Sequence, residues 1–99
     1  MKIIFLSSSS DDLRWFKRYY VSVFPQGRKK ADKQLLNTLS ILRQNPHIGH
    51  PSENFPMARE YDVTRTPFSF IYRVKQDHIE IIRVIDNRSN WDQQVLQAE

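Results

Sequence analysis

The chain has 99 residues, of which 39% are hydrophobic and 12% aromatic, and its formal net charge is +4. A chain of this size and composition can bury one hydrophobic core, so we predict a single domain over residues 1–99. It contains no cysteine, which excludes a disulfide scaffold, a thiolate metal site and a cysteine nucleophile. The positive charge favours a polyanion or an acidic protein as partner.

Targeting and membrane segments are not expected. The amino terminus carries one lysine and then only the short apolar run "IIFL", which is too short for a signal peptide. No apolar run approaches the roughly 18 residues that a membrane-spanning helix needs. We therefore predict a cytoplasmic protein without a membrane partner.

The first predicted elements are a strand and a helix. "KIIFL" at 2–6 is short, apolar and β-branched, which is typical of a buried strand. The chain then offers Ser9 or Ser10 as a helix N-cap, with Asp11 and Asp12 placed to complement the positive end of the helix dipole. Apolar residues follow at helical spacing until "FPQG" at 24–27 ends the helix.

A second helix is predicted over residues 28–44, because Ala31, Leu35, Leu39 and Leu42 form one apolar stripe before Asn45-Pro46. The two helices form an antiparallel hairpin. Residues 45–57 hold three prolines and a glycine and should form an irregular connection.

The rest of the chain predicts an antiparallel meander. Its strands are expected at 58–63, 68–75 and 78–85, and the last is apolar at nearly every position, as in a strand covered on both faces. The order β-α-α-β-β-β predicts an α+β fold, with a helical hairpin packed on a small, mainly antiparallel sheet. Residues 89–99 allow a short C-terminal helix, with Asn90 and Gln93 at capping-box spacing.

Several small-molecule chemistries are disfavoured. His47, His50 and His78 lie in a loop or at a turn without a supporting carboxylate pattern, so we expect no metal site. The two glycines stand 22 positions apart, which excludes a glycine-rich phosphate loop, and "SSSS" lacks the glycines of a nucleophile elbow. No cofactor is expected.

Basic residues are the remaining chemical signal. Four arginines lie on or beside the meander strands and a fifth follows the last strand: Arg59, Arg65, Arg73, Arg83 and Arg88. If they converged on one face they would suit a nucleic-acid backbone, because guanidinium groups bind phosphate through paired N–H donors. The alternative is that they are solvent-side residues paired with nearby Asp and Glu. "GRKKADK" at 27–33 likewise fits a solvated helix face or a phosphate-binding patch.

The whole pattern resembles one family. The segments that carry the resemblance, in order, are "DDLRWFKRYY", "LLNTLSILRQNPHIGHP", "ARE", "TPFSFIYRV" and "IEIIRVIDNRSNW". Together they resemble the RelE/ParE superfamily of toxins from type II toxin–antitoxin modules, over about residues 2–91. The segments "NPHIGHP…ARE" and "PFSFIYRV…IEIIRVIDNR" are most similar to the ParE and plasmid-stabilisation branch.

The resemblance implies one of two mechanisms. RelE-like members are ribosome-dependent endoribonucleases, and for that mechanism the matching positions are Arg65, Arg83 and Asp86. ParE-like members are described as DNA gyrase poisons that act by binding. Cleaving relatives tend to place His or Tyr where this chain has Asp86-Asn87-Arg88, and neither an ordinary carboxylate nor a guanidinium is an effective acid near neutral pH.

The resemblance, together with the missing His or Tyr at 86–88, therefore implies a ParE-like toxin that binds gyrase rather than an enzyme. A ribosome-dependent mRNA endoribonuclease is the alternative, and a non-toxic binding module or decayed paralogue is a third. The residues predicted to contact the target or phosphate are Arg59, Arg65, Arg73, Arg83, Asp86, Arg88 and Trp91.

The resemblance also implies a cognate antitoxin, a small and often acidic chain that folds on the toxin. DNA would be bound only indirectly, through the complex. The first helix carries more aromatic residues than one buried face can hold, and Trp15 and Tyr19 are the predicted antitoxin contacts in an apolar groove.

Overall fold

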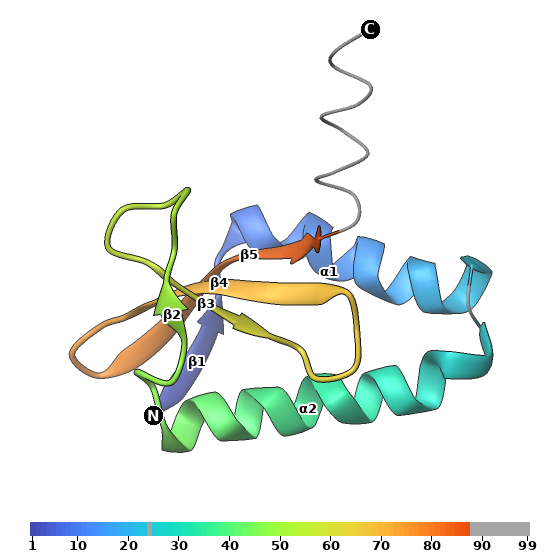
Figure 1. The fold of residues 1–99 in the computed structure, drawn as a ribbon, viewed down its shortest axis with the longest axis horizontal. Helices are drawn as coiled ribbons and strands as arrows, with labels where there is room; N and C mark the ends of the chain where they lie inside the picture. Colours follow the sequence, from blue (N-terminus) through green and yellow to red (C-terminus); the bar gives the residue numbers. More distant parts are fainter. Residues whose placement is uncertain (24, 88–99) are drawn as a thin grey trace, which may run out of the picture.

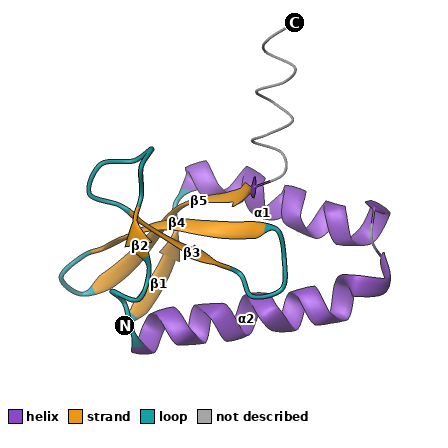
Figure 2. Cartoon of the chain, viewed as in Figure 1, coloured by secondary structure: helices purple, strands orange, loops and turns teal. Residues whose placement is uncertain are grey.

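The computed structural model describes residues 1–23 and 25–87. Two α-helices pack against a five-stranded sheet (Figures 1 and 2). The elements along the chain are β1 (Lys2–Phe5), α1 (Ser7–Arg18), α2 (Arg28–Gln44), β2 (His50–Pro51), β3 (Arg59–Asp62), β4 (Phe68–Val74) and β5 (His78–Asp86). Between the helices the chain forms a π-helical segment (Tyr19–Val23) and a short 3₁₀ turn (Pro25–Gly27).

The strand order is β1-β5-β4-β3-β2. β1 pairs with β5 in parallel, and every other neighbouring pair is antiparallel. The predicted α+β fold and element order are thus confirmed. β2 was not predicted, because two residues that include a proline carry no periodicity. The C-terminal helix predicted at 89–99 lies outside the described residues.

Both helices cover the same face of the sheet. Their buried residues Phe16, Leu35 and Leu42 join one core with Phe70 and Ile81 of the central strands. The rings of Phe16 and Phe68 meet edge to face, with centroids 4.7 Å apart. Burial of these apolar and aromatic side chains is the main force that holds the helical hairpin on the sheet. Neither helix in this part of the chain has the length and apolarity needed to span a membrane.

A β-bulge interrupts β5. Tyr72 of β4 pairs with Ile81, whereas the adjacent Ile71 pairs with Arg83, so Ile82 is the extra residue. Successive residues of a strand alternate between faces, and the bulge shifts this alternation by one position. It therefore places Val84 with Ile81 on the helix side, and Arg83 on the other side.

The start of α1 completes the edge of β5. β1 ends at Phe5, and beyond it Leu6 N donates to Ile81 O at 3.0 Å, while Ser8 Oγ donates to Ile82 O at 2.7 Å. One turn later, Val84 N donates to the Asp12 carboxylate at 3.0 Å. Beyond the end of β1, the side chains of Ser8 and Asp12 therefore supply hydrogen-bond partners for the backbone of β5. A buried strand edge left unpaired would be costly.

The predicted helix cap is wrong in detail. α1 begins at Ser7 rather than after Ser9 or Ser10, its N-cap is Leu6, and no side chain caps it. Ser9 is buried and its hydroxyl donates to Leu6 O at 2.7 Å instead. Asp12 was assigned to the helix dipole from the sequence, but it lies beyond the first turn and bonds to β5.

Candidate functional site

Arg83 is held by Asp12 in a two-point ion pair. Arg83 Nε and Nη2 donate to the two carboxylate oxygens at 2.6 Å and 3.0 Å, and Val84 N donates to the same carboxylate. The Asp12 side chain is 15% exposed and that of Arg83 is 42% exposed. The hydrogen bond with Asp12 raises the pKa of Arg83, so this guanidinium is permanently charged. Its main contact in the described structure is therefore internal.

Arg59 and Arg73 also have internal partners. Arg59 Nη1 donates to the carbonyl oxygens of His47 and Gly49, at 3.3 Å and 2.7 Å, and so fastens the loop before β2. Arg73 Nη2 lies 3.7 Å from a Glu80 oxygen, one of the carboxylates expected to pair with these arginines. Arg73 Nε is buried without a hydrogen-bond partner among the described residues.

Arg65 and Asp86 are placed very differently. Arg65 lies in the exposed turn between β3 and β4 with a positive φ of 60°, which is uncommon for a residue with a side chain. No described residue pairs with its guanidinium. Asp86 pairs with Phe68 across the sheet, lies on the helix side and is only 6% exposed.

The end of β5 is tied to the neighbouring strands by a relay of polar side chains. Asn87 Nδ2 donates to Ser69 Oγ at 3.1 Å, and Ser69 Oγ donates to an Asp62 oxygen at 2.6 Å. Asn87 N donates to Pro67 O at 2.9 Å. Asn87 therefore stabilises the place where the strand ends.

The predicted basic surface is thus not one convergent face. By strand register, Arg59 and Asp86 belong to the helix side, while Arg73 and Arg83 belong to the opposite side. Arg65 is the member of the set that is both exposed and without a partner in the described part of the chain. Arg88 and Trp91 lie outside the described residues. A role of these residues in target contact stays a prediction.

The predicted antitoxin contacts lie along α1. Trp15 is 41% exposed, and its ring centroid lies 6.4 Å from that of Tyr19. Tyr19 is half-buried and also contacts Phe68, at a centroid distance of 5.8 Å. Trp15 therefore offers the accessible aromatic surface, while Tyr19 links it to the core.

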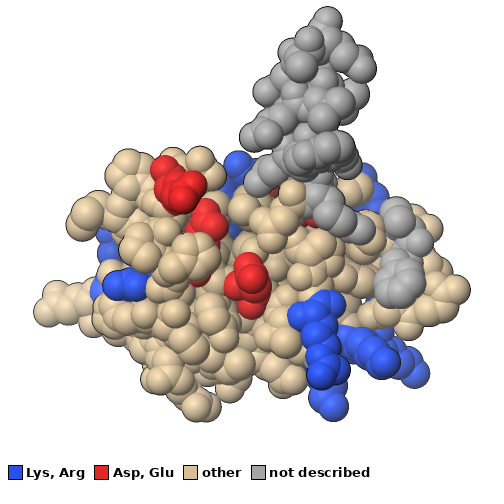
Figure 3. Space-filling view, in the orientation of Figure 1, with Lys and Arg blue, Asp and Glu red and all other residues tan. Residues whose placement is uncertain are grey.

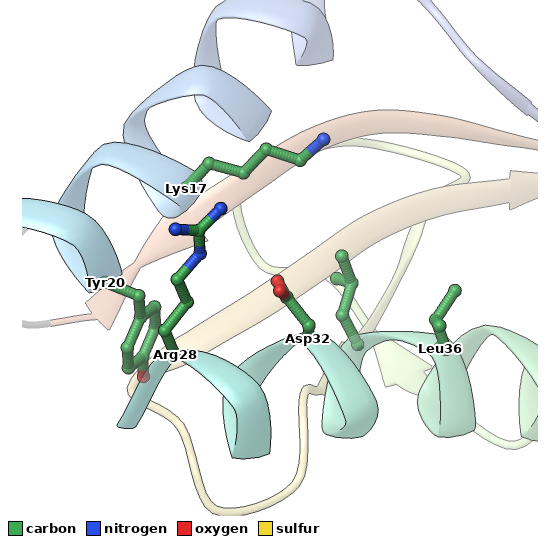
Figure 4. Close-up of a pocket in the computed structure, with 6 residues that line it drawn as sticks. Lys17, Tyr20, Arg28, Asp32 and Leu36 are labelled. Carbon is green, nitrogen blue, oxygen red and sulfur yellow. The ribbon is translucent and has the colours of Figure 1, made fainter. Parts of the chain in front are cut away.

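A groove of about 360 Å³ lies between the two helices. Figure 4 shows Lys17 reaching into it from α1, and Arg28 and Asp32 reaching into it from α2. Its floor and rim are completed by Tyr20, Leu35 and Leu36, of which Leu36 is 66% exposed. The groove therefore combines an apolar base with basic side chains from both helices and the Asp32 carboxylate of α2.

A second recess of about 170 Å³ lies next to the start of α2. Lys30 lines it from α2 and Arg65 lines it from the β3–β4 turn, and Tyr20 lines both recesses. On the face drawn in Figure 3, basic side chains gather at the end where α2 begins and stand apart from the acidic ones.

The β4–β5 hairpin carries a further charged cluster. The ring nitrogens of His78 lie 2.7 Å from an Asp77 oxygen and 3.2 Å from a Glu80 oxygen. Hydrogen bonding to Asp77 and then to Glu80 raises the pKa of His78, and hydrogen bonding to His78 lowers that of Asp77. Residues 1–23 and 25–87 contain no group of three or more His, Asp or Glu side chains that could hold a metal ion.

The most specific contact that sequence patterns missed is that of Tyr72. Its hydroxyl accepts from Gly49 N at 2.9 Å and donates to Pro46 O at 2.8 Å, which fixes the loop ahead of β2. Burial raises the pKa of Tyr72, so the hydroxyl keeps its proton. A side chain at position 49 would meet Glu60 O at 2.6 Å and Tyr72 Oη at 2.7 Å, so glycine is required there.

Comparison with known proteins identifies a protein family and solved structures to which the chain is similar. The family model of the ParE toxin of the type II toxin–antitoxin system parDE matches residues 3–91. A chain of the solved structure titled "Chromosomal ParDE TA system from P. aeruginosa" is 30% identical, with a TM-score of 0.70. The match covers 87% of the present chain and 95% of that chain. The comparison with curated proteins found no match.

Proposed function

Because this chain belongs to the ParE toxin family of type II toxin–antitoxin systems, we propose that it inhibits growth by binding DNA gyrase and that a cognate antitoxin neutralises it. In this proposal the toxin acts through a protein–protein contact and performs no chemical step. The protein works in the cytoplasm, where its target is found.

The main support for the proposal is that two candidate catalytic residues, Arg83 and Asp86, are engaged or buried within the fold. Arg83 is bound at two points by Asp12, and Asp86 is 6% exposed on the helix side of the sheet. Strand register puts these two residues on opposite faces. A ribonuclease needs a positioned acid and base together with an anion stabiliser around one phosphate. The internal use of Arg83 and the burial of Asp86 favour a binding mechanism instead.

Purified toxin added to a gyrase supercoiling and DNA-cleavage assay tests the proposal. We expect loss of supercoiling and accumulation of cleaved DNA in proportion to the toxin added. The matched control is toxin mixed beforehand with its antitoxin, which should restore supercoiling. Unaltered gyrase activity at toxin concentrations that arrest growth would reject the proposal.

The alternative enzyme activity is decided by in vitro translation followed by mapping of mRNA 5′ ends. The proposal predicts intact message. New 5′ ends that appear only with ribosomes, and that disappear in an Arg65→Ala variant, would establish a ribosome-dependent endoribonuclease in its place. A soluble protein that arrests neither growth nor translation would instead be a non-toxic binding module.

The antitoxin proposal is supported by the helical hairpin. Trp15 on α1 and Leu36 on α2 are exposed apolar side chains, and Leu36 lines the groove together with Lys17 and Arg28, whereas Trp15 lies outside the lining of that groove. An acidic chain that folds on binding could cover this apolar surface and satisfy those charges. Co-expression with the adjoining open reading frame, followed by isolation of a stable complex, tests this partner.

A further inference from the structure

The free end of the helical hairpin concentrates positive charge. Residues 13–36 contain a single acidic residue, Asp32. The basic residues that share this end of the fold are all exposed: Lys17 and Arg18 in the last turn of α1, Arg28, Lys29, Lys30 and Lys33 at the start of α2, and Arg65 in the β3–β4 turn. We call this set the basic end.

These cations are not neutralised internally. The ion pairs in the described part of the chain involve none of them, and Asp32 is in none either. Lys29 and Lys33 stand four residues apart on one helix face, where like charges destabilise a helix by a few tenths of a kcal/mol. α2 also has no acidic residue in its first turn and no side-chain cap, so nothing offsets its positive end.

The fold brings these charges together from three separate segments. Lys17 of α1 and Arg28 of α2 reach into the groove between the helices (Figure 4). Lys30 of α2 and Arg65 of the β3–β4 turn line the neighbouring recess. Each of two adjacent hollows is therefore lined by two cations from different elements, and the first is also lined by the Asp32 carboxylate. The cations outnumber this one anion, an arrangement suited to successive phosphates of a polyanion.

We propose that the basic end is a docking surface for the backbone of double-stranded DNA. Duplex DNA carries one negative charge per roughly 1.7 Å of its axis, so a small surface can contact several phosphates at once. Sites for single strands add aromatic stacking platforms. Of the described aromatic residues near this end, Tyr20 is buried and Tyr19 is half-buried, and the exposed Trp15 lines neither hollow, so the hollows offer no exposed stacking platform for single strands. The inference concerns the toxin itself, departs from the expectation that DNA is bound only through the antitoxin complex, and does not depend on the proposed gyrase target.

Fluorescence anisotropy with a labelled duplex of about 20 base pairs tests the proposal across a series of salt concentrations. The test variant is Lys29→Gln/Lys30→Gln/Lys33→Gln, which removes three exposed charges and keeps helix-forming side chains. The matched control is Lys2→Gln/Arg43→Gln/Lys75→Gln, which removes three exposed charges outside the basic end. Thermal unfolding checks that both variants fold.

We expect the test variant to bind the duplex at least about tenfold more weakly. Its plot of log affinity against log salt should be flatter by about 2 to 3, because each phosphate contact contributes about 0.9 to the slope. The control should lose less than about threefold. Equal loss of affinity in both variants would show that only the net charge matters, and it would overturn the proposal. Failure of the wild type to bind the duplex at low salt would also overturn it.

Two further arms separate the competing partners. Tighter binding of a single strand of the same sequence would contradict docking of a duplex. If the test variant keeps its duplex affinity but loses binding to a poly-glutamate peptide, the basic end recognises acidic protein and the DNA proposal is wrong. Because gyrase is absent from the titration, its outcome is independent of the proposed target.

Discussion

The hydroxyl of Tyr72 connects two parts of the chain that are far apart in sequence. It joins β4 to Gly49 and Pro46, just ahead of β2, and Arg59 holds the same loop through the Gly49 carbonyl. The Gly49 N–H is buried and the Pro46 carbonyl is partly buried there, so both depend on the Tyr72 hydroxyl for a hydrogen bond. Losing one partner in such a contact leaves the others unsatisfied, which costs more than the bond itself contributes.

Replacing Tyr72 with Phe should therefore lower the free energy of unfolding by about 1–3 kcal/mol with little change in packing, because it leaves the Gly49 N–H and the Pro46 carbonyl without their partner. Urea unfolding measures the effect. Tyr61→Phe is the control: Tyr61 is half-buried, its hydroxyl has no hydrogen bond among the described residues, and its removal should cost less than about 0.5 kcal/mol. Equal stability of the Tyr72 variant and the wild type would contradict the assigned hydrogen bonds.

Two adjacent aspartates allow a sharper test. Asp12 accepts hydrogen bonds from Arg83 and from Val84 N, whereas Asp11 forms an exposed pair with Arg14. We expect Asp12→Asn to lose about 1–3 kcal/mol of unfolding free energy, because a partly buried, charge-assisted contact is broken. Asp11→Asn should change stability by less than about 0.5 kcal/mol. Similar losses in the two variants, measured by denaturant unfolding, would show that Asp12 does not anchor β5.

At the scale of single elements, the β4–β5 hairpin should make stability depend on pH. The folded-state pKa of His78 is raised by Asp77 and Glu80. The stabilisation from its charged form is therefore complete below the unfolded-state pKa of about 6.5, and is lost as the pH rises through the higher folded-state value. The stability difference between the wild type and His78→Gln should be larger at about pH 5.5 than at about pH 8.5.

Thermal unfolding at the two pH values measures that difference. His47→Gln is the control, because His47 is exposed and its side chain has no hydrogen bond among the described residues. If the stability difference between the wild type and His78→Gln stays constant or grows as the pH rises, the hydrogen bonds assigned to His78, Asp77 and Glu80 are contradicted.

On helix α1, we expect one substitution to weaken antitoxin binding with little effect on the stability of the toxin. Trp15 is 41% exposed, so Trp15→Ala should lower the free energy of unfolding by less than about 1 kcal/mol. If it anchors the antitoxin, the same change should weaken antitoxin affinity at least about tenfold, measured by calorimetry. Met57→Ala, at a side chain that is 92% exposed and lies outside the helices, should change neither quantity. Unchanged antitoxin affinity in the Trp15 variant would remove it from the interface.

Elements with strong periodicity could be predicted from the sequence. The predicted helix at 28–44 coincides with α2, and the strands at 68–75 and 78–85 differ from β4 and β5 by one residue each. Their apolar side chains recur at the spacing that burial on one face requires. Local capping signals were less reliable, because Ser9 and Asp12 make tertiary contacts instead of capping α1.

The candidate site could not be predicted to the same degree. β5 is apolar at most positions, so its sequence does not reveal the bulge at Ile82 that decides which side Arg83 occupies. Arg83 pairs with Asp12, which lies 71 positions away, and no spacing rule selects that partner over the nearby carboxylates. Long-range pairing of charged residues follows from the tertiary arrangement, whereas sequence patterns report mainly local periodicity.

At the scale of the whole molecule, the charged groups divide into two kinds. Arginines of the sheet are used internally: Arg59 binds loop carbonyls, Arg73 lies beside Glu80, and Arg83 pairs with Asp12. The basic end, in contrast, has no ion pair among the described residues and is exposed. The sheet arginines therefore stabilise the fold, and the charges of the basic end are the ones that stay exposed to solvent, which is why we propose that end as the docking surface for duplex DNA.

We propose that this ParE-family toxin acts on gyrase by binding. The most direct measurement is the amount of gyrase covalently attached to chromosomal DNA after the toxin is induced without its antitoxin. We predict that these covalent complexes accumulate before growth stops and that messenger RNA stays intact in the same culture. Growth arrest with no increase in covalent gyrase–DNA complexes would contradict gyrase as the target.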